Sequence, residues 1–270
     1  MAKTILITGS TDGIGLETAK LLTTSGHTLL IHGRNQKKLD AAVGKVSAIA
    51  GAGHIESYVA DLSKFEDVII LANQIRERHQ HLDVLINNAG VLKTPNPITA
   101  NGLDVRFVVN TIAPYLLTQE LRTIMDSTSR VVNVSSAAQT TVNLNALAGR
   151  QHCQDDMDAY GQSKLAITMW TSALADAWKD GPMVVAVNPG SLLASKMVRD
   201  GFGVDGNDIR IGADILSRAA LSEEFENATG QYFDNDAGRF AQPHPDALDQ
   251  HKCDKLVASI EEILTSANVS

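Results

Sequence analysis

The sequence contains little cysteine, with only Cys153 and Cys253 among 270 residues. Two distant cysteines cannot form a disulfide framework or a paired metal spacing, so a reducing compartment is the better fit. Basic residues are also scarce: 23 Lys and Arg face 31 Asp and Glu, and the net charge is -8. This balance gives no general electrostatic reason to bind nucleic acid. We therefore expect a small-molecule partner.

Long apolar runs are missing as well. None reaches the roughly eighteen residues that would mark a membrane span, and the first residues enter an apolar strand without the features of a signal peptide. We expect a cytoplasmic protein with no membrane partner. No metal site is expected either, because His79 and His81 lack a third ligand nearby and suit a solvated, cationic helix end.

Short apolar, β-branched runs alternate with segments of helical spacing. The expected strands lie at 4–7, 28–31, 54–59, 84–86, 130–134 and 183–187, with an edge strand near 230–233, and the clearest helical segments are 16–22, 39–49, 68–75 and 165–178. This alternation predicts right-handed crossovers. The expected fold is a single α/β, doubly wound Rossmann-type domain over 1–270, with a mainly parallel seven-stranded sheet and helices on both faces. The polar stretch 139–158 is expected to be a long loop.

A glycine-rich turn, Gly9-Ser10-Thr11-Asp12-Gly13-Ile14-Gly15, follows the first expected strand and opens the first helix. Gly9 permits a tight turn, Gly13 lets the backbone approach a pyrophosphate, and Gly15 allows the helix to pack closely on the sheet. Taken alone, such a turn can equally be a strand-to-helix connection without a ligand. The turn has three residues between its first two glycines, whereas the commonest dinucleotide-binding motif, G-x-G-x-x-G, has one.

The turn resembles the opening motif of the short-chain dehydrogenases, and further motifs of that family follow in the family's order. They are Asn87-Asn88-Ala89-Gly90, Asn110, Ser136, Tyr160-x-x-x-Lys164 and Asn188-Pro189-Gly190. The resemblance covers the chain from Thr4 to about Gly190. The long gap between Ser136 and Tyr160 is similar to that of the retinol-dehydrogenase-like branch.

The resemblance implies catalytic roles for Ser136, Tyr160, Lys164 and Asn110. Tyr160 and Lys164 are four residues apart in a helical segment and so share one face. A phenol with a pKa of about 10 is a poor proton shuttle at neutral pH. An adjacent ammonium lowers this pKa because it favours the phenolate. In the family, the lysine also binds the nicotinamide ribose, the serine contacts the substrate oxygen, and the asparagine kinks its helix and holds a water. Ser135 remains an alternative to Ser136 by chemistry alone, because neighbouring strand residues face opposite sides.

The second strand ends without the acidic residue that usually accepts hydrogen bonds from an NAD ribose. Arg34 stands there instead, and its guanidinium can pair with the 2′-phosphate of NADP. NADP is therefore expected over NAD, although Arg34 can also be a solvated helix-start residue. Asp61 resembles the family's adenine contact and can alternatively cap the following helix through Ser63.

The expected cofactor-binding residues combine the turn, Arg34 and the positions implied by the resemblance. They are Gly9, Ser10, Thr11, Asp12, Gly13, Ile14, Gly15, Arg34, Asn35, Asp61, Leu62, Asn88, Ala89, Gly90, Tyr160, Lys164, Pro189, Gly190 and Ser191. Asn87 is expected to stabilise the central sheet. The segment after Gly190 is one residue longer than the family's usual spacing, which leaves Ser191 and Ser195 as alternatives for the nicotinamide carboxamide contact.

These features predict an NADP-dependent oxidoreductase that transfers a hydride between nicotinamide and a carbonyl/alcohol pair. Segment 137–158 is expected to form a substrate loop and segment 191–215 to cover the substrate. A second class of function is a non-catalytic dinucleotide-binding regulatory or scaffold protein, which loss of Tyr160 or Lys164 would have favoured. The family commonly pairs through its long helices, so a homodimer or homotetramer is expected by resemblance.

Overall fold

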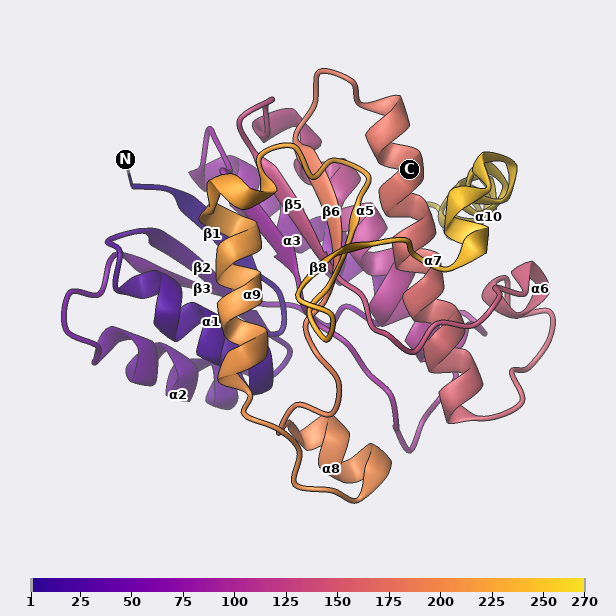
Figure 1. Cartoon of the computed structure of the whole chain (residues 1–270), viewed down its shortest axis with the longest axis horizontal. Helices are drawn as coiled ribbons and strands as arrows, with labels where there is room; N and C mark the ends of the chain where they lie inside the picture. The colour runs from indigo at the N-terminus through magenta and orange to yellow at the C-terminus, as the bar shows by residue number, and fades with distance from the viewer. Residues whose placement is uncertain (1, 270) are drawn as a thin grey trace.

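The structure is a computed structural model that describes residues 2–269, with only the backbone described at position 202. Its centre is one eight-stranded sheet in the order β3-β2-β1-β4-β5-β6-β7-β8 (Figure 1). The strands are β1 (Thr4–Ile7), β2 (Thr28–Gly33), β3 (Ile55–Val59), β4 (Val84–Asn87), β5 (Arg130–Val134), β6 (Met183–Asn188), β7 (Tyr232–Asp234) and β8 (Arg239–Ala241). All neighbours pair in parallel except β7 and β8. The chain reverses its direction of winding between β1 and β4, where doubly wound sheets bind ligands.

Helices cover both faces of this sheet. The longer ones are α1 (Gly13–Thr23), α2 (Gln36–Ser47), α3 (Phe65–Arg78), α5 (Ala113–Leu121), α7 (Asp156–Ala177), α9 (Arg210–Leu221) and α10 (Gln250–Ser266). Between them lie the shorter α4 (Val105–Phe107), η1 (Val108–Ile112), η2 (Arg122–Ile124), α6 (Leu144–Leu147), α8 (Lys196–Phe202), η3 (Glu223–Phe225) and η4 (Pro245–Leu248). No helix in residues 2–269 combines the length and the apolar character that crossing a bilayer requires.

Two apolar cores lie on opposite faces of the sheet because successive strand residues point to opposite sides. Leu6 and Leu30 join the core under α3, α5 and α7, whereas Ile5, Ile7 and Ile31 join the core under α1, α2 and α9. The strands are therefore apolar on both faces, as expected for a buried parallel sheet.

Helix α7 is enclosed more completely than the others. Its middle, from Gly161 to Thr171, is buried on every side, and α10 packs along it. The Tyr115 hydroxyl in α5 donates to Glu261 in α10 at 2.9 Å, so the C-terminal helix is tied to both long helices of the second half.

The doubly wound fold expected from the sequence is confirmed, with two corrections. The strand expected near 230–233 is β7, but it is not an edge strand, because the short β8 pairs outside it and makes eight strands rather than seven. The stretch 139–158 is not a continuous loop: it contains α6, capped by Asn143, and its last residues begin α7.

Substitutions at two glycines, one packed and one exposed, test how tightly α1 packs on the sheet. A Cβ on Gly15 would lie 2.4 Å from Asn88 Nδ2 and 2.6 Å from the Gly9 carbonyl oxygen, so Gly15→Ala should lower the free energy of unfolding by about 1–3 kcal/mol. The matched change Gly44→Ala, in an exposed helical position with open space around it, should raise it by about 0.5–1 kcal/mol. Urea unfolding measures both values, and equal effects at the two positions would contradict the packing described here.

Candidate active site

The glycine-rich turn lies against the segment that follows β4. Gly9 (φ +64°) and Gly13 (φ +59°) adopt the left-handed conformation that glycine tolerates best. A Cβ on Gly9 would lie 2.8 Å from the Cα of Ala89, so two backbone segments touch here with no side chain between them. Gly13, by contrast, faces open space, with its nearest neighbour the Ser195 Cβ at 3.9 Å.

Hydrogen bonds lock the turn to this neighbour. Asn88 Nδ2 donates to the carbonyl oxygens of Thr8 (2.8 Å) and Gly9 (3.1 Å), and the Thr8 hydroxyl accepts from the N–H groups of Asn88 and Ala89. The side chain of Ser10 is buried and donates to the Ile7 carbonyl, and its N–H donates to the His32 carbonyl, so both of its donors have partners within the protein. These contacts give the turn a fixed shape.

Helix α1 begins in this turn. Its N-cap, Asp12, accepts from the N–H of Gly13, and the helix runs for 11 residues. The N-terminus of such a helix presents unsatisfied N–H groups and a partial positive charge, which suit a phosphate. Together with the open space at Gly13, this chemistry fits the pyrophosphate of a dinucleotide.

Arg34 is exposed where β2 ends, and no hydrogen bond or ion pair joins its side chain to another residue in the described part of the chain. Asn35 caps α2 by accepting from the N–H of Lys38. Asp61 accepts from both the N–H (3.1 Å) and the hydroxyl (2.8 Å) of Ser63. The N-cap of α3 is Lys64, so Asp61 closes the turn before the helix instead of capping it.

Tyr160 and Lys164 lie one turn apart on α7, as their spacing predicts. The Lys164 Nζ is 5.7 Å from the centroid of the Tyr160 ring and donates to the Val134 carbonyl oxygen at 2.7 Å. Burial lowers the pKa of Lys164 to about 8. Burial also raises the pKa of Tyr160, and the Ser136 hydroxyl opposes that rise. Burial is thus the largest influence on the pKa of the phenol in this arrangement.

The two serines at the end of β5 have separate environments. Ser135 is buried, and its hydroxyl lies 2.7 Å from the Thr168 hydroxyl and 3.1 Å from the Lys164 carbonyl oxygen, so it holds β5 to α7. Ser136 is partly exposed and lies beside Tyr160. The structure thus brings Ser136, not Ser135, into the group formed with Tyr160 and Lys164.

The backbone of Ser136 is fixed by residues that the sequence did not point to. Its carbonyl oxygen accepts from Gln139 Nε2 at 2.9 Å and from the Tyr232 hydroxyl at 3.2 Å. Tyr232 belongs to β7 and is 96 positions away, so no local pattern connects the two.

Asn110 lies in the π turn η1, where the helix between α4 and α5 is widened by one residue per turn. Such turns are common at functional sites. Its side chain donates to the Val91 carbonyl and the Ser163 hydroxyl, both at 2.9 Å, and accepts from the Val91 N–H at 2.8 Å. The predicted distortion is present, and the amide joins α7 to the segment after β4. Asn87 donates to Thr118 and Asn133, the structural role expected for it.

The turn that follows β6 is held by the β7–β8 hairpin. Asp236 accepts from the N–H (2.8 Å) and the hydroxyl (2.6 Å) of Ser191 and from Asn188 Nδ2 (2.9 Å). Asn235 Nδ2 donates to the Pro189 carbonyl at 2.9 Å. Ser195 caps α8 by accepting from the N–H of Val198. Of the two serines considered for a carboxamide contact, Ser191 therefore has its hydroxyl bound to the Asp236 carboxylate, and Ser195 accepts a backbone N–H.

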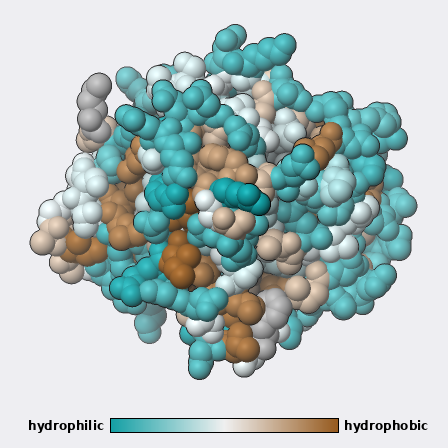
Figure 2. Space-filling model, viewed as in Figure 1, coloured by the Kyte–Doolittle hydropathy of each residue, from teal (hydrophilic) through white to brown (hydrophobic). Residues whose placement is uncertain are grey.

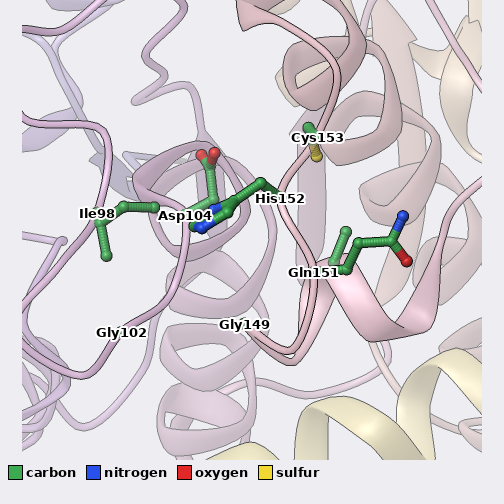
Figure 3. Close-up of a pocket in the computed structure, with 8 residues that line it drawn as sticks. Ile98, Gly102, Asp104, Gly149, Gln151, His152 and Cys153 are labelled. Atoms are coloured by element: carbon green, nitrogen blue, oxygen red, sulfur yellow. The ribbon is translucent and has the colours of Figure 1, made fainter.

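The two segments expected to form the substrate pocket, 137–158 and 191–215, have different surfaces. Figure 3 shows a small hollow where residues 149–153 of the first segment meet Ile98, Gly102 and Asp104, and none of the catalytic candidates lines it. Burial raises the pKa of the Cys153 thiol in this hollow to about 11, which makes it a poor nucleophile. The second segment contains α8, and Figure 2 shows hydrophobic surface gathered around α8 and the lower end of α9, where the exposed apolar residues are Leu192, Val204 and Ile211.

This arrangement places a phenol, an ammonium and a hydroxyl at the carboxyl edge of the sheet. The Gly90 backbone lies between these groups and the glycine-rich turn. It is close to both Lys164 and Asn110, since a Cβ on Gly90 would lie 3.7 Å from Lys164 Nζ and 3.5 Å from Asn110 Oδ1. The group can hold and move a proton at one oxygen atom while a ligand lies along the turn. No cluster of His, Cys, Asp or Glu suited to a metal ion occurs within residues 2–269.

Comparison with known proteins agrees with this description. The short chain dehydrogenase family profile matches residues 3–202. Human retinol dehydrogenase 13 is 28% identical over 275 residues, covering 95% of this chain and 82% of that protein. A putative uncharacterized protein from Mycobacterium paratuberculosis has a similar structure, with a TM-score of 0.80, 27% identity and coverage of 97% of this chain and 93% of that one. A metagenomic short-chain oxidoreductase in complex with NADP has a TM-score of 0.62, 25% identity and coverage of 82% and 92%.

The burial of Lys164 predicts a specific pH dependence of stability. Its pKa is about 8 in the folded chain and near 10.5 when exposed, so the unfolded chain binds more protons between these values and this residue's contribution to stability rises with pH. Relative to wild type, Lys164→Met should therefore lose about 2 kcal/mol of unfolding free energy between pH 7 and pH 10.

Urea unfolding at pH 7, 8, 9 and 10 measures this difference. The exposed Lys38→Met serves as the control and should follow the wild type across the series. A Lys164→Met variant with the wild-type pH slope would show that the ammonium is solvated rather than buried.

Proposed function

Because the chain belongs to the short-chain dehydrogenase family and is similar to the retinol dehydrogenases, we propose that it is an NADP-dependent oxidoreductase of a carbonyl/alcohol pair. One observation carries the proposal. Tyr160, Lys164 and Ser136 form one group beside the turn that opens α1, although Ser136 follows β5 and the other two lie in α7. Membership of the family makes the chain an oxidoreductase that acts on a CH–OH or C=O group.

Each side chain has a distinct task in the proposed reaction. When bound, the nicotinamide supplies or accepts the hydride at the carbon of the substrate's C–O group. The Tyr160 hydroxyl gives its proton to the substrate oxygen in reduction and takes it back in oxidation. The Ser136 hydroxyl donates a hydrogen bond to the same oxygen while negative charge develops there.

Lys164 and Asn110 are proposed to assist this proton transfer without contacting the substrate oxygen. The Lys164 ammonium, 5.7 Å from the Tyr160 ring centroid, favours the phenolate after the proton has left. It is also the residue that would bind the nicotinamide ribose. The two N–H donors of the Asn110 side chain are engaged with Val91 and Ser163, so a proton-relaying water would be held by the second lone pair of its Oδ1 or by its backbone.

The cofactor would lie along the carboxyl edge of the sheet. The turn from Gly9 to Gly15 would receive the pyrophosphate, and the segment from Asn88 to Gly90 the adenosine ribose. Pro189 and Gly190 would contact the nicotinamide. For Ser191 we propose only a backbone contact, because its hydroxyl is held by Asp236.

The preference for NADP rests on Arg34. Its guanidinium is exposed at the end of β2, where an acidic residue would favour NAD. The pairing of a guanidinium with a 2′-phosphate needs a free side chain and two well-placed donors, both of which Arg34 offers. The metagenomic relative in complex with NADP supports a nicotinamide dinucleotide phosphate as the ligand.

The substrate pocket would be formed by segments 137–158 and 191–215. The exposed apolar side chains of the second segment, Leu192, Val204 and Ile211, favour a substrate with an apolar part. A non-catalytic dinucleotide-binding role is the weaker candidate, because Ser136, Tyr160 and Lys164 are all present and lie together.

A change at Tyr160 tests the proposed chemistry. Tyr160→Phe removes the proton donor and should lower kcat for NADPH-dependent reduction of an aldehyde or ketone by at least about 100-fold. The affinity for NADPH should stay within a few-fold of the wild type, because the ring is retained. Absorbance at 340 nm follows turnover, and calorimetric titration measures binding.

The matched control is Tyr58→Phe, which removes a hydroxyl bonded to Glu56 on the outer strand β3 and should leave kcat unchanged. Turnover by Tyr160→Phe at the wild-type rate would remove Tyr160 from the mechanism. A wild type that binds NADPH but reduces no member of a broad aldehyde and ketone panel would favour the non-catalytic role.

A change at Arg34 tests the cofactor preference. Arg34→Ala removes charge-assisted hydrogen bonds to the 2′-phosphate and should weaken NADPH binding by about 10- to 100-fold. The affinity for NADH should hardly change, since NADH has no such phosphate. Lys45→Ala, at an exposed position on α2, is the control and should affect neither cofactor. An equal loss for NADPH and NADH would contradict the role assigned to Arg34.

A further inference from the structure

The buried histidine at the carboxyl end of β2 has contacts that the proposed reaction does not use. His32 is only 2% exposed. Its Nδ1 accepts from the N–H of Gly9 at 3.1 Å, and its Nε2 lies 3.0 Å from the Ala60 carbonyl oxygen. An N–H can only donate and a carbonyl can only accept, so the ring is the neutral tautomer with its proton on Nε2.

Two consecutive peptide groups of the glycine-rich turn are held from both sides. In the peptide between Thr8 and Gly9, the carbonyl accepts from Asn88 Nδ2 and the N–H donates to the His32 ring. In the next peptide, the Gly9 carbonyl accepts from Asn88 Nδ2 and the Ser10 N–H donates to the His32 carbonyl. The Ser10 N–H is bound by the backbone carbonyl of residue 32, which any amino acid supplies. The Gly9 N–H, by contrast, requires a side-chain acceptor at position 32.

The same ring joins two parts of the cofactor site. Ala60 directly precedes Asp61, the residue assigned to the adenine, whereas Gly9 opens the turn assigned to the pyrophosphate. The donor on Nε2 and the acceptor on Nδ1 therefore fix these two backbone segments at one distance from each other.

We propose that neutral His32 is a positioning residue that holds the glycine-rich turn and the end of β3 in the conformation that binds the dinucleotide. This inference rests on the proposed function and adds a residue outside the family motifs described above. His32 does not touch the ligand: its ring fixes the peptide group between Thr8 and Gly9, and so the course of the turn that leads to α1. Its loss should raise the KM for NADPH and leave kcat at saturating cofactor nearly unchanged, because Tyr160 and Lys164 keep their places.

The surroundings of the ring keep it neutral. Burial lowers the pKa of His32 to about 4. The turn contributes uncharged Gly9 and Ser10, β3 is followed by uncharged Ala60, and the charge that acts on the ring is the Asp61 carboxylate, which favours protonation. The pKa lies below the usual value of 6.5, so the contribution of His32 to stability is present above pH 6.5 and is lost as the pH falls toward 4.

Three variants test the proposal. His32→Ala removes the acceptor and should raise the KM for NADPH about tenfold at pH 7.5, with kcat within twofold. His32→Asn places Oδ1 where Nδ1 was, so it should restore the KM to within threefold of the wild type. The control is His27→Ala: His27 is also buried and also accepts a backbone N–H, that of Lys3, through Nδ1, but it lies at the other end of β2 and should leave the KM unchanged.

Unfolding measurements provide a second readout if His32→Ala folds poorly. Between pH 7 and pH 5, the unfolding equilibrium constant of the wild type should rise about twentyfold more than that of His32→Asn, which has no group to protonate. Equal KM values for the wild type and His32→Ala, or the absence of rescue by Asn, would overturn the positioning role while leaving the proposed function intact. A wild type that binds neither NADPH nor NADH would overturn the proposed function and this role with it.

Discussion

The candidate active site depends on the contact between two backbone segments that leave no room for side chains. The glycine-rich turn and the segment after β4 touch at Gly9 and Ala89, and Asn88 and Thr8 lock them together. This contact sets where α1 begins and how its N-terminus faces the edge of the sheet. It also sets the position of the Gly90 backbone, which lies next to Lys164 and Asn110. A single steric constraint thus links the surface suited to a phosphate with the groups suited to proton transfer.

The proposed catalytic group illustrates how burial sets the chemistry of ordinary side chains. The middle of helix α7 is enclosed on all sides, so the Lys164 ammonium finds a protein partner, the Val134 carbonyl, and loses solvation. Desolvation raises the pKa of Tyr160, which keeps the phenol protonated until a reaction withdraws the proton. Ser136 stays partly exposed at the rim, where a substrate oxygen could reach it. The site combines a protonated acid, a nearby cation and an accessible hydroxyl, which suits reduction of a carbonyl.

Local patterns in the sequence were sufficient for the fold and for much of the site. The alternation of apolar runs predicted the doubly wound sheet, and the four-residue spacing predicted that Tyr160 and Lys164 share a helix face. Long-range contacts were not predictable, because the Tyr232 to Ser136 and Asp236 to Ser191 hydrogen bonds span 96 and 45 positions. The three-residue strand β8 is too short to show a periodicity. In the sequence, His32 looks like any other residue of β2. Its role becomes visible only when the fold places the glycine-rich turn against its ring.

The β7–β8 hairpin contacts both sides of the place where substrate and nicotinamide are proposed to meet. Tyr232 holds the backbone of Ser136, and Asp236 holds the backbone of Ser191. Loop exchange aimed at a new substrate would therefore succeed only if the hairpin were transplanted together with the loop it braces. The hairpin lies after the last of the family motifs, yet it supports the backbone on both sides of the proposed site. Changes in the hairpin would therefore be expected to alter substrate selectivity and reaction rate together.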